Sequence, residues 1–340
     1  MRPLASALTV ALVLLLPPAA KALPGDEIYA KAGQLVLASD GAKLNFYCMG
    51  AGSPAVIFDA GDGDWSAVWA AVQPRVAQWT RACSYDRAGL GFSELGPKPR
   101  TVERLAQELH SALHKARIKG PYILVGHAFG GYAARAFADN YLSELAGMVL
   151  IEGDARDLET SPDMPKIWQG IYERNLASLR FCGAATAGTK LPLTPPADHP
   201  TRNCNDYSFR GLPEAQFSLQ LNSALENLVA TKSALFEAGI GEHEAWWTDD
   251  EYLKAHRKSL GRRPLRIITA DQHIPDRPDT TEARRKEHAI FNREHKITQA
   301  RMLDLSSNAK QILTQTGPFV QLDRPDIVID AIREVYEQAK

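Results

Sequence analysis

The 340-residue sequence lacks an excess of charge of either sign. It contains 39 Lys and Arg residues and 40 Asp and Glu residues, which gives a net charge of −1. No basic excess points to a nucleic-acid partner, and no acidic run points to a disordered tail. Internal repeats and low-complexity tracts are missing as well. The length therefore fits one large α/β domain with an insertion, or two small domains.

Cysteine is scarce, and its spacing excludes a C-x-x-C redox or zinc pair. The sequence also shows no metal-ligand spacing and no phosphate-binding glycine loop, so we expect neither a metal nor a cofactor. The number of cysteines is even, which favours disulfides if the protein is exported, and four buried free thiols are the alternative. The four residues are Cys48, Cys83, Cys182 and Cys204.

Only the N-terminal region carries a long apolar run. Met1-Arg2 supplies a positive charge, Leu4 to Leu16 form an apolar segment, and Pro17-Pro18 end it. Ala20-Lys21-Ala22 then has the small-x-small pattern of a signal-peptidase site. A membrane anchor would need about 20 apolar residues. We therefore expect residues 1–22 to be a signal peptide, with export to the periplasm or the exterior and no membrane span after cleavage.

Short apolar runs alternate with helical patterns along most of the chain. Several runs are apolar throughout, which is typical of a parallel sheet covered on both faces. We expect strands at 34–38, 43–48, 55–59, 81–85, 147–151, 264–269 and 310–314, with a further strand starting at Tyr122. We expect helices at 64–78, 101–116, 131–140, 281–300 and 325–339, the first of them kinked or divided by Pro74.

The strand that starts at Tyr122 runs into Gly126-His127-Ala128-Phe129-Gly130. This segment has the frame of the G-x-S-x-G nucleophile elbow, with alanine at the serine position. The elbow needs small residues at both ends because strand and helix approach closely across a strained turn. An alanine methyl group fits this space but cannot attack a substrate. A loop of unrelated origin could show the same glycine spacing by chance.

Several motifs in the same order resemble the α/β-hydrolase superfamily, and in particular an exported bacterial esterase-like branch. They are Ala60 to Gly63 after the third strand, Tyr85 to Ser93 after the fourth, the elbow after the fifth, and Gly317 to Pro325 near the C-terminus. The resemblance covers residues 34–155 and 260–338. It implies an α/β-hydrolase fold, with a mostly parallel eight-stranded sheet, helices on both faces and a helical cap insertion.

The resemblance also implies a division of the chain. Residues 23–155 and 256–340 would form the core, and residues 156–255 would form a cap or lid over the active-site mouth. Most aromatic side chains of this insertion are expected to pack its own small core, and a few to line the pocket. The resemblance further suggests that Cys48 pairs with Cys83 across neighbouring strands, and that Cys182 pairs with Cys204 within the cap. The aromatic residues are Trp168, Tyr172, Phe181, Tyr207, Phe217, Phe236, Trp246 and Trp247.

Members of the family use a serine nucleophile, a histidine base and a carboxylate that orients the histidine. By resemblance, Ala128 occupies the nucleophile position and Pro318 the base position, so neither group is present. Proline has no proton-accepting side chain and fixes φ, so the loop is expected to be reshaped as well. Three residues could be considered as substitutes. Ser93 belongs to a different loop, His273 after the seventh strand is interpreted as a solvated loop histidine, and His127 is expected to pack away from the pocket, so none of them is expected to replace these groups.

Two carboxylates are candidates for the acid that orients the base. Glu152 follows the sixth strand, where Asp154 is also close, and Asp271 follows the seventh. His273 stands at the acid position expected after the seventh strand, so Glu152 is favoured. The oxyanion hole would use the backbone N–H groups of Asp62 and Phe129. These donors do not depend on side-chain identity and should survive.

Three functions remain open from the sequence. The first is a hydrolase scaffold that has lost serine hydrolysis and retains a ligand pocket. The second is a disabled version of an active, exported esterase-like hydrolase. The third, a lyase or isomerase step in the same pocket, is disfavoured by Pro318. In each case the ligand or substrate would be small, ester-like or partly apolar, since it must fit a covered cleft.

Overall fold

The computed structural model describes residues 23, 25–159, 161–186, 204, 217–271, 274, 276 and 280–340. The expected signal peptide, Tyr207 and His273 lie outside these residues, and the interpretations that concern them stay predictions. Within the described ranges, no helix combines the length and the apolar composition that crossing a membrane would require.

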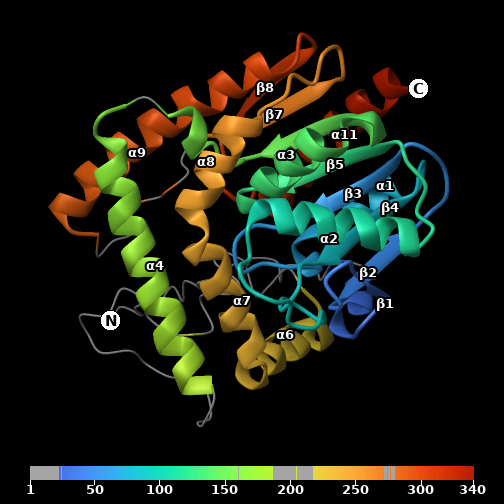
Figure 1. The fold of residues 1–340 in the computed structure, drawn as a ribbon, viewed down its shortest axis with the longest axis horizontal. Helices are drawn as coiled ribbons and strands as arrows, with labels where there is room; N and C mark the ends of the chain where they lie inside the picture. The colour runs from blue at the N-terminus through green and yellow to red at the C-terminus, as the bar shows by residue number, and fades with distance from the viewer. Residues whose placement is uncertain are drawn as a thin grey trace, which may run out of the picture.

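An eight-stranded sheet forms the centre of the molecule, in the order β1-β2-β4-β3-β5-β6-β7-β8 (Figure 1). Strand β2 runs antiparallel to β1 and β4, and all pairs from β4 to β8 are parallel. The expected mostly parallel sheet is confirmed. The strands are β1 Gln34–Leu37, β2 Lys43–Met49, β3 Ala55–Asp59, β4 Ala82–Asp86, β5 Tyr122–His127, β6 Leu145–Ile151, β7 Leu265–Ala270 and β8 Ala309–Thr314.

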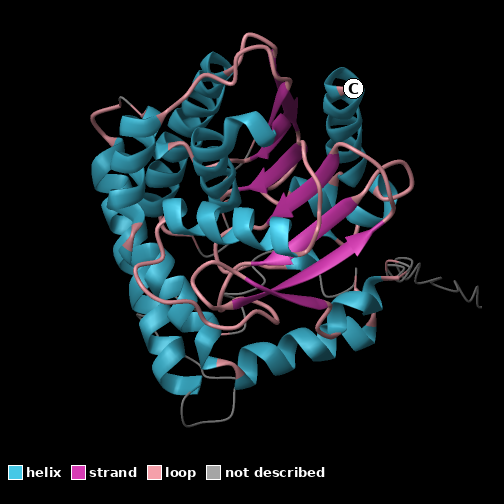
Figure 2. Cartoon of the chain, turned by 45° about the vertical axis from the view of Figure 1, so that its right-hand side comes forward, coloured by secondary structure: helices cyan, strands magenta, loops and turns pink. Residues whose placement is uncertain are grey.

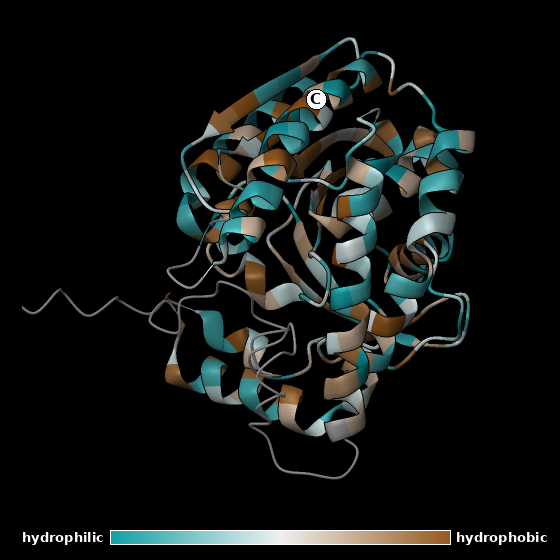
Figure 3. Cartoon of the chain, turned by 90° about the vertical axis from the view of Figure 1, so that its left-hand side faces the viewer, coloured by the Kyte–Doolittle hydropathy of each residue, from teal (hydrophilic) through white to brown (hydrophobic). Residues whose placement is uncertain are grey.

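Two apolar clusters cover the two faces of the sheet. Helices α2 (Val102–Lys115) and α3 (Phe129–Tyr141) contribute to one cluster, and α1 (Gln73–Val76) and α11 (Pro325–Ala339) to the other. Every residue of β3 and β5 is buried between them. Figure 2 shows the twisted strands with helices outside them, and in Figure 3 hydrophobic and hydrophilic residues alternate along the helices. This is the pattern expected of helices that bury one side.

Local sequence signals set several helix ends. The Thr101 side chain accepts a hydrogen bond from Arg104 N at the start of α2 (3.3 Å). Thr281 caps α9 (Glu282–Arg301) in the same way, as expected of N-cap residues. The helix expected at 64–78 is divided into η2 (Ser66–Trp69) and α1, with Pro74 in the first turn of α1. Proline is tolerated there because the first N–H groups of a helix have no intrahelical acceptor.

The described part of residues 156–255 contains helices and no strand. Helix α4 packs against α7 and α9, and α8 lies against α2 and α3. Figure 1 shows α4, α7 and α8 beside the sheet. The helices are η4 Arg156–Leu158, α4 Met164–Thr186, α6 Leu219–Thr231, α7 Ser233–Glu244 and α8 Trp246–His256. The remaining elements are η1 Asp26–Ala30, η3 Leu142–Glu144, η6 Met302–Leu305 and α10 Val320–Asp323.

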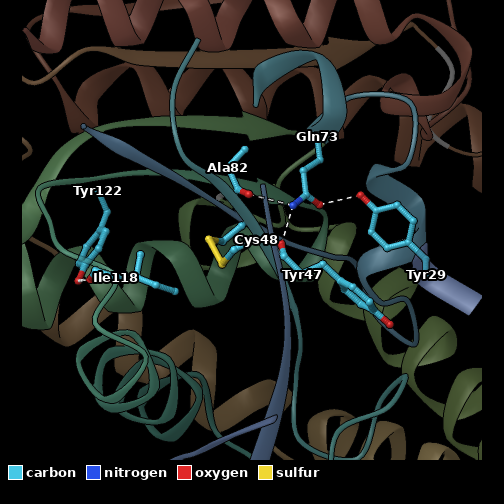
Figure 4. The surroundings of a disulfide bond; sticks show 8 residues. Tyr29, Tyr47, Cys48, Gln73, Ala82, Ile118 and Tyr122 are labelled. Carbon is cyan, nitrogen blue, oxygen red and sulfur yellow. Dashed lines mark hydrogen bonds between the residues drawn. A yellow bond between two sulfur atoms is a disulfide. The ribbon is translucent and has the colours of Figure 1, made fainter. Parts of the chain in front are cut away.

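Two disulfides join the four cysteines in the expected pairs. Cys48 and Cys83 stand directly opposite each other on β2 and β4. Cys182, on α4, is bonded to Cys204. Near the first disulfide, the Gln73 side-chain amide donates to the carbonyl oxygens of Tyr47 and Ala82 (Figure 4). The disulfide and this buried amide together tie β2, β4 and α1.

Candidate functional site

The turn between β5 and α3 holds Ala128 in a strained backbone conformation, with φ 46° and ψ −117°. Its N–H donates to Ile151 O (3.0 Å), and its carbonyl oxygen accepts from Gly131 N (2.9 Å) and Asp154 N (3.0 Å). A positive φ at a residue other than glycine persists only where the surroundings impose it. Here the hydrogen bonds to the end of β6 and the start of α3 impose it. The residue as a whole is partly exposed.

Two glycines allow this turn to form. A Cβ added at Gly126 would lie 2.6 Å from Gly130 O, and one at Gly130 would lie 2.5 Å from both Asp59 O and Ala60 O. Any side chain at either position would therefore collide with backbone atoms. The expected reason for the glycine spacing, a close approach of strand and helix, is confirmed at both ends.

The loop after β3 lies against the start of α3, because Gly130 contacts its first carbonyl groups. Phe129 is the first residue of α3, so its N–H has no acceptor within the helix. Asp62 lies in the facing loop, and its Oδ2 is 3.5 Å from Nε2 of the buried His243 on α7. The two expected oxyanion donors thus belong to neighbouring segments, and their role stays a prediction.

Arg87 fixes the loop after β3. Its buried guanidinium forms ion pairs with Asp59 and Glu242, both at 2.8 Å. It also donates to Ala60 O (2.5 Å) and Gly61 O (2.7 Å). In the sequence Arg87 is visible only as part of a motif, and nothing marks Glu242, because the two lie 155 residues apart. One side chain therefore connects β3, the facing loop and helix α7.

The rest of the motif after β4 is structural. The Asp86 carboxylate accepts hydrogen bonds from Ser66 N (3.0 Å), Phe92 N (2.9 Å) and Asn45 Nδ2 (2.8 Å). The Ser93 hydroxyl donates to Asp86 O (2.6 Å) and accepts from Asn45 N (2.8 Å). Ser93 is buried, so it supports the loop and does not present a nucleophile.

The loop after β8 reaches the elbow. His127 Nε2 lies 3.1 Å from Pro318 O, so this nitrogen carries the proton and donates. The His127 ring also packs against Phe319, with the ring centroids 5.2 Å apart. Pro318 is therefore next to the residue that precedes Ala128. The structure brings the expected base position and the expected nucleophile position together, although neither holds a reactive group.

The two acid candidates have different surroundings. Glu152 is fully buried, has φ 49° and accepts a hydrogen bond from Ala270 N through Oε1 (2.7 Å). Its Oε2 lies 3.3 Å from His295 Nε2, on α9. Asp271 is exposed, and its N–H donates to Thr314 O (2.9 Å). Nothing in the sequence assigns a role to His295, because the pattern of a polar helix does not mark one histidine as functional. The carboxylate of Glu152 thus engages β7 and α9.

Buried polar contacts attach the helices of residues 219–256 to the core. Asp249 accepts a hydrogen bond from Val102 N at the start of α2 (3.0 Å), and burial raises the pKa of its carboxyl to about 8. Tyr132 OH donates to Asp250 (2.9 Å). Lys232 donates to Ser93 O (2.5 Å), and burial lowers the pKa of its amine to about 8. These contacts hold α7 and α8 beside the elbow.

A cavity of about 590 Å³ lies between η1 and β2, away from the elbow. Its lining includes Ile28, Tyr47, Met49 and Pro74, together with the sequence around Lys31 to Gln34. None of the expected catalytic or oxyanion residues contributes to it, although the disulfide-bonded Cys48 does. A ligand pocket at the elbow itself therefore stays a prediction.

Comparison with known proteins agrees with this geometry. Residues 50–331 match the model of the alpha/beta hydrolase family. The chain is 38% identical over 92 residues to an uncharacterized protein of Schizosaccharomyces pombe, covering 27% of this chain and 17% of that protein. It is 26% identical over 163 residues to 2-hydroxy-6-oxo-2,4-heptadienoate hydrolase of Pseudomonas putida, covering 45% and 55%. The matches thus span less than two thirds of either relative.

A solved structure with the same fold is a thermophilic esterase from Thermogutta terrifontis. Its TM-score is 0.54 at 19% identity, and the alignment covers 90% of this chain and 98% of the esterase. At that identity the likeness concerns the fold. The match to the family over most of the chain decides membership, and the glycine-bracketed turn at Ala128 fits it. The chain belongs to the α/β-hydrolase family.

Proposed function

We propose that this chain is an exported α/β-hydrolase-fold protein of carboxylic-ester-hydrolase ancestry that has no serine-hydrolase activity and retains a site for a small, partly apolar ligand. The observation that carries the proposal is Ala128, which has the strained backbone of an elbow residue and a methyl side chain. The fold positions a nucleophile at this point, and the chain supplies none.

The other members of the catalytic set support the same conclusion. Pro318 lies beside His127 at the position proposed for the base, and it can neither accept nor return a proton. Glu152, the favoured acid, has no histidine at position 318 to orient. Its carboxylate instead accepts a hydrogen bond from Ala270 N and lies beside His295. Removing nucleophile and base from such a unit typically lowers kcat by a factor of about a million.

The scaffold for binding is the part we propose to be retained. Phe129 N–H and the loop at Asp62 are the proposed oxyanion donors, and Arg87 fixes that loop through Ala60 O and Gly61 O. Backbone donors at a helix start attract carbonyl or carboxylate oxygens whether or not a nucleophile is present. An ester-like or carboxylate-bearing ligand with an apolar part would fit this set.

Two alternatives lead to different expectations. A disabled variant of an active hydrolase would regain turnover when its missing groups are restored. A ligand-binding pseudoenzyme that diverged further would not, because its pocket would no longer align an ester carbonyl with the elbow. A lyase or isomerase step is disfavoured because Pro318 removes the histidine on which family chemistry depends.

The test compares four proteins on a chromogenic short-acyl ester: the parent chain, Ala128→Ser, Pro318→His and the double variant. We expect no turnover from the parent chain or from either single variant, because nucleophile and base act as a unit. Turnover by the double variant would favour the disabled hydrolase, and its absence would favour the diverged pseudoenzyme. Each single variant is the matched control for the other group. Turnover by the parent chain that a substitution at the elbow abolishes would contradict the proposal.

Export is proposed from the cysteines and the N-terminal run. Both cysteine pairs are disulfide-bonded, and stable disulfides are typical of oxidising compartments. Expression of the full chain followed by fractionation should give a mature protein that begins after Ala22 and has no titratable thiol when unfolded without reductant. A cytoplasmic protein with an intact N-terminus and four thiols would contradict this part of the proposal.

A further inference from the structure

Three side chains with metal-binding groups converge at the start of β6, at the opposite end of this strand from the elbow. His110 and His114 lie on α2, and Glu144 ends η3. His110 Nε2 is 2.8 Å from Glu144 Oε1, and His114 Nε2 is 2.8 Å from Glu144 Oε2. One atom from each of the three residues lies within 4.8 Å of the others.

The convergence follows from helix geometry and from the fold. Residues four apart on a helix lie one above the other, so the two imidazoles share one face of α2. The His110 ring also stacks on Tyr141, with the centroids 3.7 Å apart and the planes at 2°. Because α2 packs against α3, which leads into η3, Glu144 is brought to this face from 30 residues away. The sequence spacing of the histidines alone did not reveal a third ligand.

The donor set suits a transition metal. Two imidazoles and one carboxylate are the protein ligands of one common class of zinc site, in which water completes a tetrahedral shell. With metal–ligand bonds of about 2.0–2.2 Å, the ligand atoms of such a shell are roughly 3.4 Å apart. The observed arrangement needs only small side-chain movements to reach this spacing. The three side chains are 24%, 55% and 29% exposed, so an ion can enter from solvent.

We propose that His110, His114 and Glu144 bind one divalent transition-metal ion, with Zn²⁺ as the expected occupant. Cu²⁺ and Ni²⁺ are expected to bind as well, since imidazole ligands suit both ions. The bound ion would join α2 to the segment that leads into β6. Its role would be to strengthen this connection, because the seven residues of β6 separate the site from the elbow by roughly 20 Å.

A second histidine–carboxylate pair provides a matched control. His288 Nδ1 lies 2.7 Å from Asp276 Oδ1, a contact as short as those to Glu144. Among the described residues, His110, His114 and Glu144 form the one group of three such ligands. If one histidine and one carboxylate were sufficient, His288 with Asp276 would bind the metal ion as well as the three-ligand cluster does. If three ligands are needed, only the cluster will bind.

The experiment uses the full chain without a histidine tag, treated with chelator and then titrated with ZnCl₂ against a competing zinc indicator. We expect one Zn²⁺ per chain with a dissociation constant in the micromolar range. His114→Asn and Glu144→Gln should each weaken this binding at least tenfold, and His288→Asn should leave it unchanged. Both substituted ligands are partly or largely exposed, so the variants are expected to fold, which circular dichroism will check.

A second measurement uses the unaltered chain, so its result does not depend on whether the variants fold. Zn²⁺ should protect His110 and His114 from acylation by diethyl pyrocarbonate, read by mass spectrometry, and should leave His288 reactive. The proposal is overturned if no saturable binding appears below about 100 μM, if the ligand variants bind as the parent does, or if the two histidines are not protected. In each of these cases the cluster is only a hydrogen-bonded group.

Discussion

The sheet and the helices of residues 219–256 are held in place by different combinations of apolar and polar contacts. Strands β3 and β5 are buried throughout and carry almost only apolar side chains. Helices α7 and α8 also bury apolar side chains, such as Phe236 and Leu253, but in addition they meet the core through Glu242 with Arg87 and through Asp249 with Val102 N. Apolar burial is strong but has no preferred direction, whereas buried hydrogen bonds and ion pairs have strict geometry.

The elbow and the neighbouring helix α7 differ in what fixes their positions. The turn at Ala128 is defined by backbone contacts that any sequence with the right glycines can make. The position of α7 beside it depends on specific charged side chains. Scaffold and surroundings can therefore change independently, and chemistry can be lost at Ala128 without loss of the fold. Three substitutions test this contrast, in order of decreasing effect.

Arg87→Met should have the largest effect. It leaves Asp59 and Glu242 buried without their common counter-charge, and breaking such a pair from one side costs about 3–5 kcal/mol. The free energy of unfolding in urea will measure the loss. Arg324→Met is the control, because its ion pair with Asp326 is exposed and should give no measurable change. A loss below about 1 kcal/mol for Arg87→Met would show that α7 is held mainly by apolar contacts.

Gly130→Ala should have the second-largest effect on stability. The added methyl group would meet Asp59 O and Ala60 O at 2.5 Å, and backbone atoms can yield only by moving β3 away from α3. We expect a loss of about 3 kcal/mol in urea unfolding. Gly261→Ala is the matched control, because its φ of +63° carries backbone strain but its Cβ meets nothing within 4 Å. That control should lose about 1 kcal/mol. Equal losses would mean that close packing at the elbow contributes little.

Asp249→Asn should have the smallest effect at pH 5, and one that grows as the pH rises. Burial raises the pKa of the Asp249 carboxyl to about 8 in the folded chain, compared with about 4 when unfolded. Between these values only the folded chain keeps the proton, so rising pH lowers stability. The asparagine retains an acceptor for Val102 N and does not ionise.

The measurement for Asp249 is the stability of both proteins at pH 5 and pH 8. Over this interval the parent chain should lose about 3–4 kcal/mol more than Asp249→Asn does, as the two pKa values require. The difference between the two curves isolates this group, because Glu108 and Glu159, whose pKa values burial raises to about 7, titrate in both proteins. Parallel curves would show that Asp249 is ionised in the folded chain.

Much of the fold could be predicted because its signals are local. Apolar runs indicated the strands, Thr101 and Thr281 indicated helix starts, and the motifs around Gly126 and Gly317 indicated the family. The helix expected at 64–78 is two short pieces, since Pro74 starts a new one. Its division was foreseen, but the short lengths depend on packing against β4 and α11.

The candidate site could be predicted only in part. Ala128 and Pro318 were located by motif, and their proximity follows from adjacent strand ends. The partners of Glu152 could not be predicted, since His295 comes from a helix 143 residues later and no pattern links the two. Arg87 with Glu242, and the histidine pair on α2 with Glu144, were missed for the same reason.

The sequence by itself determined the order of strands and helices, the glycines that permit the elbow, and the presence of alanine at position 128 and proline at position 318. Only the tertiary structure decided which charged residues meet. Hydrophobic periodicity and turn signals act over a few residues, so they can be read along the chain. Ion pairs and ligand clusters instead join residues that chain folding brings together from distant positions, and their partners become visible only once the sheet and helices are assembled.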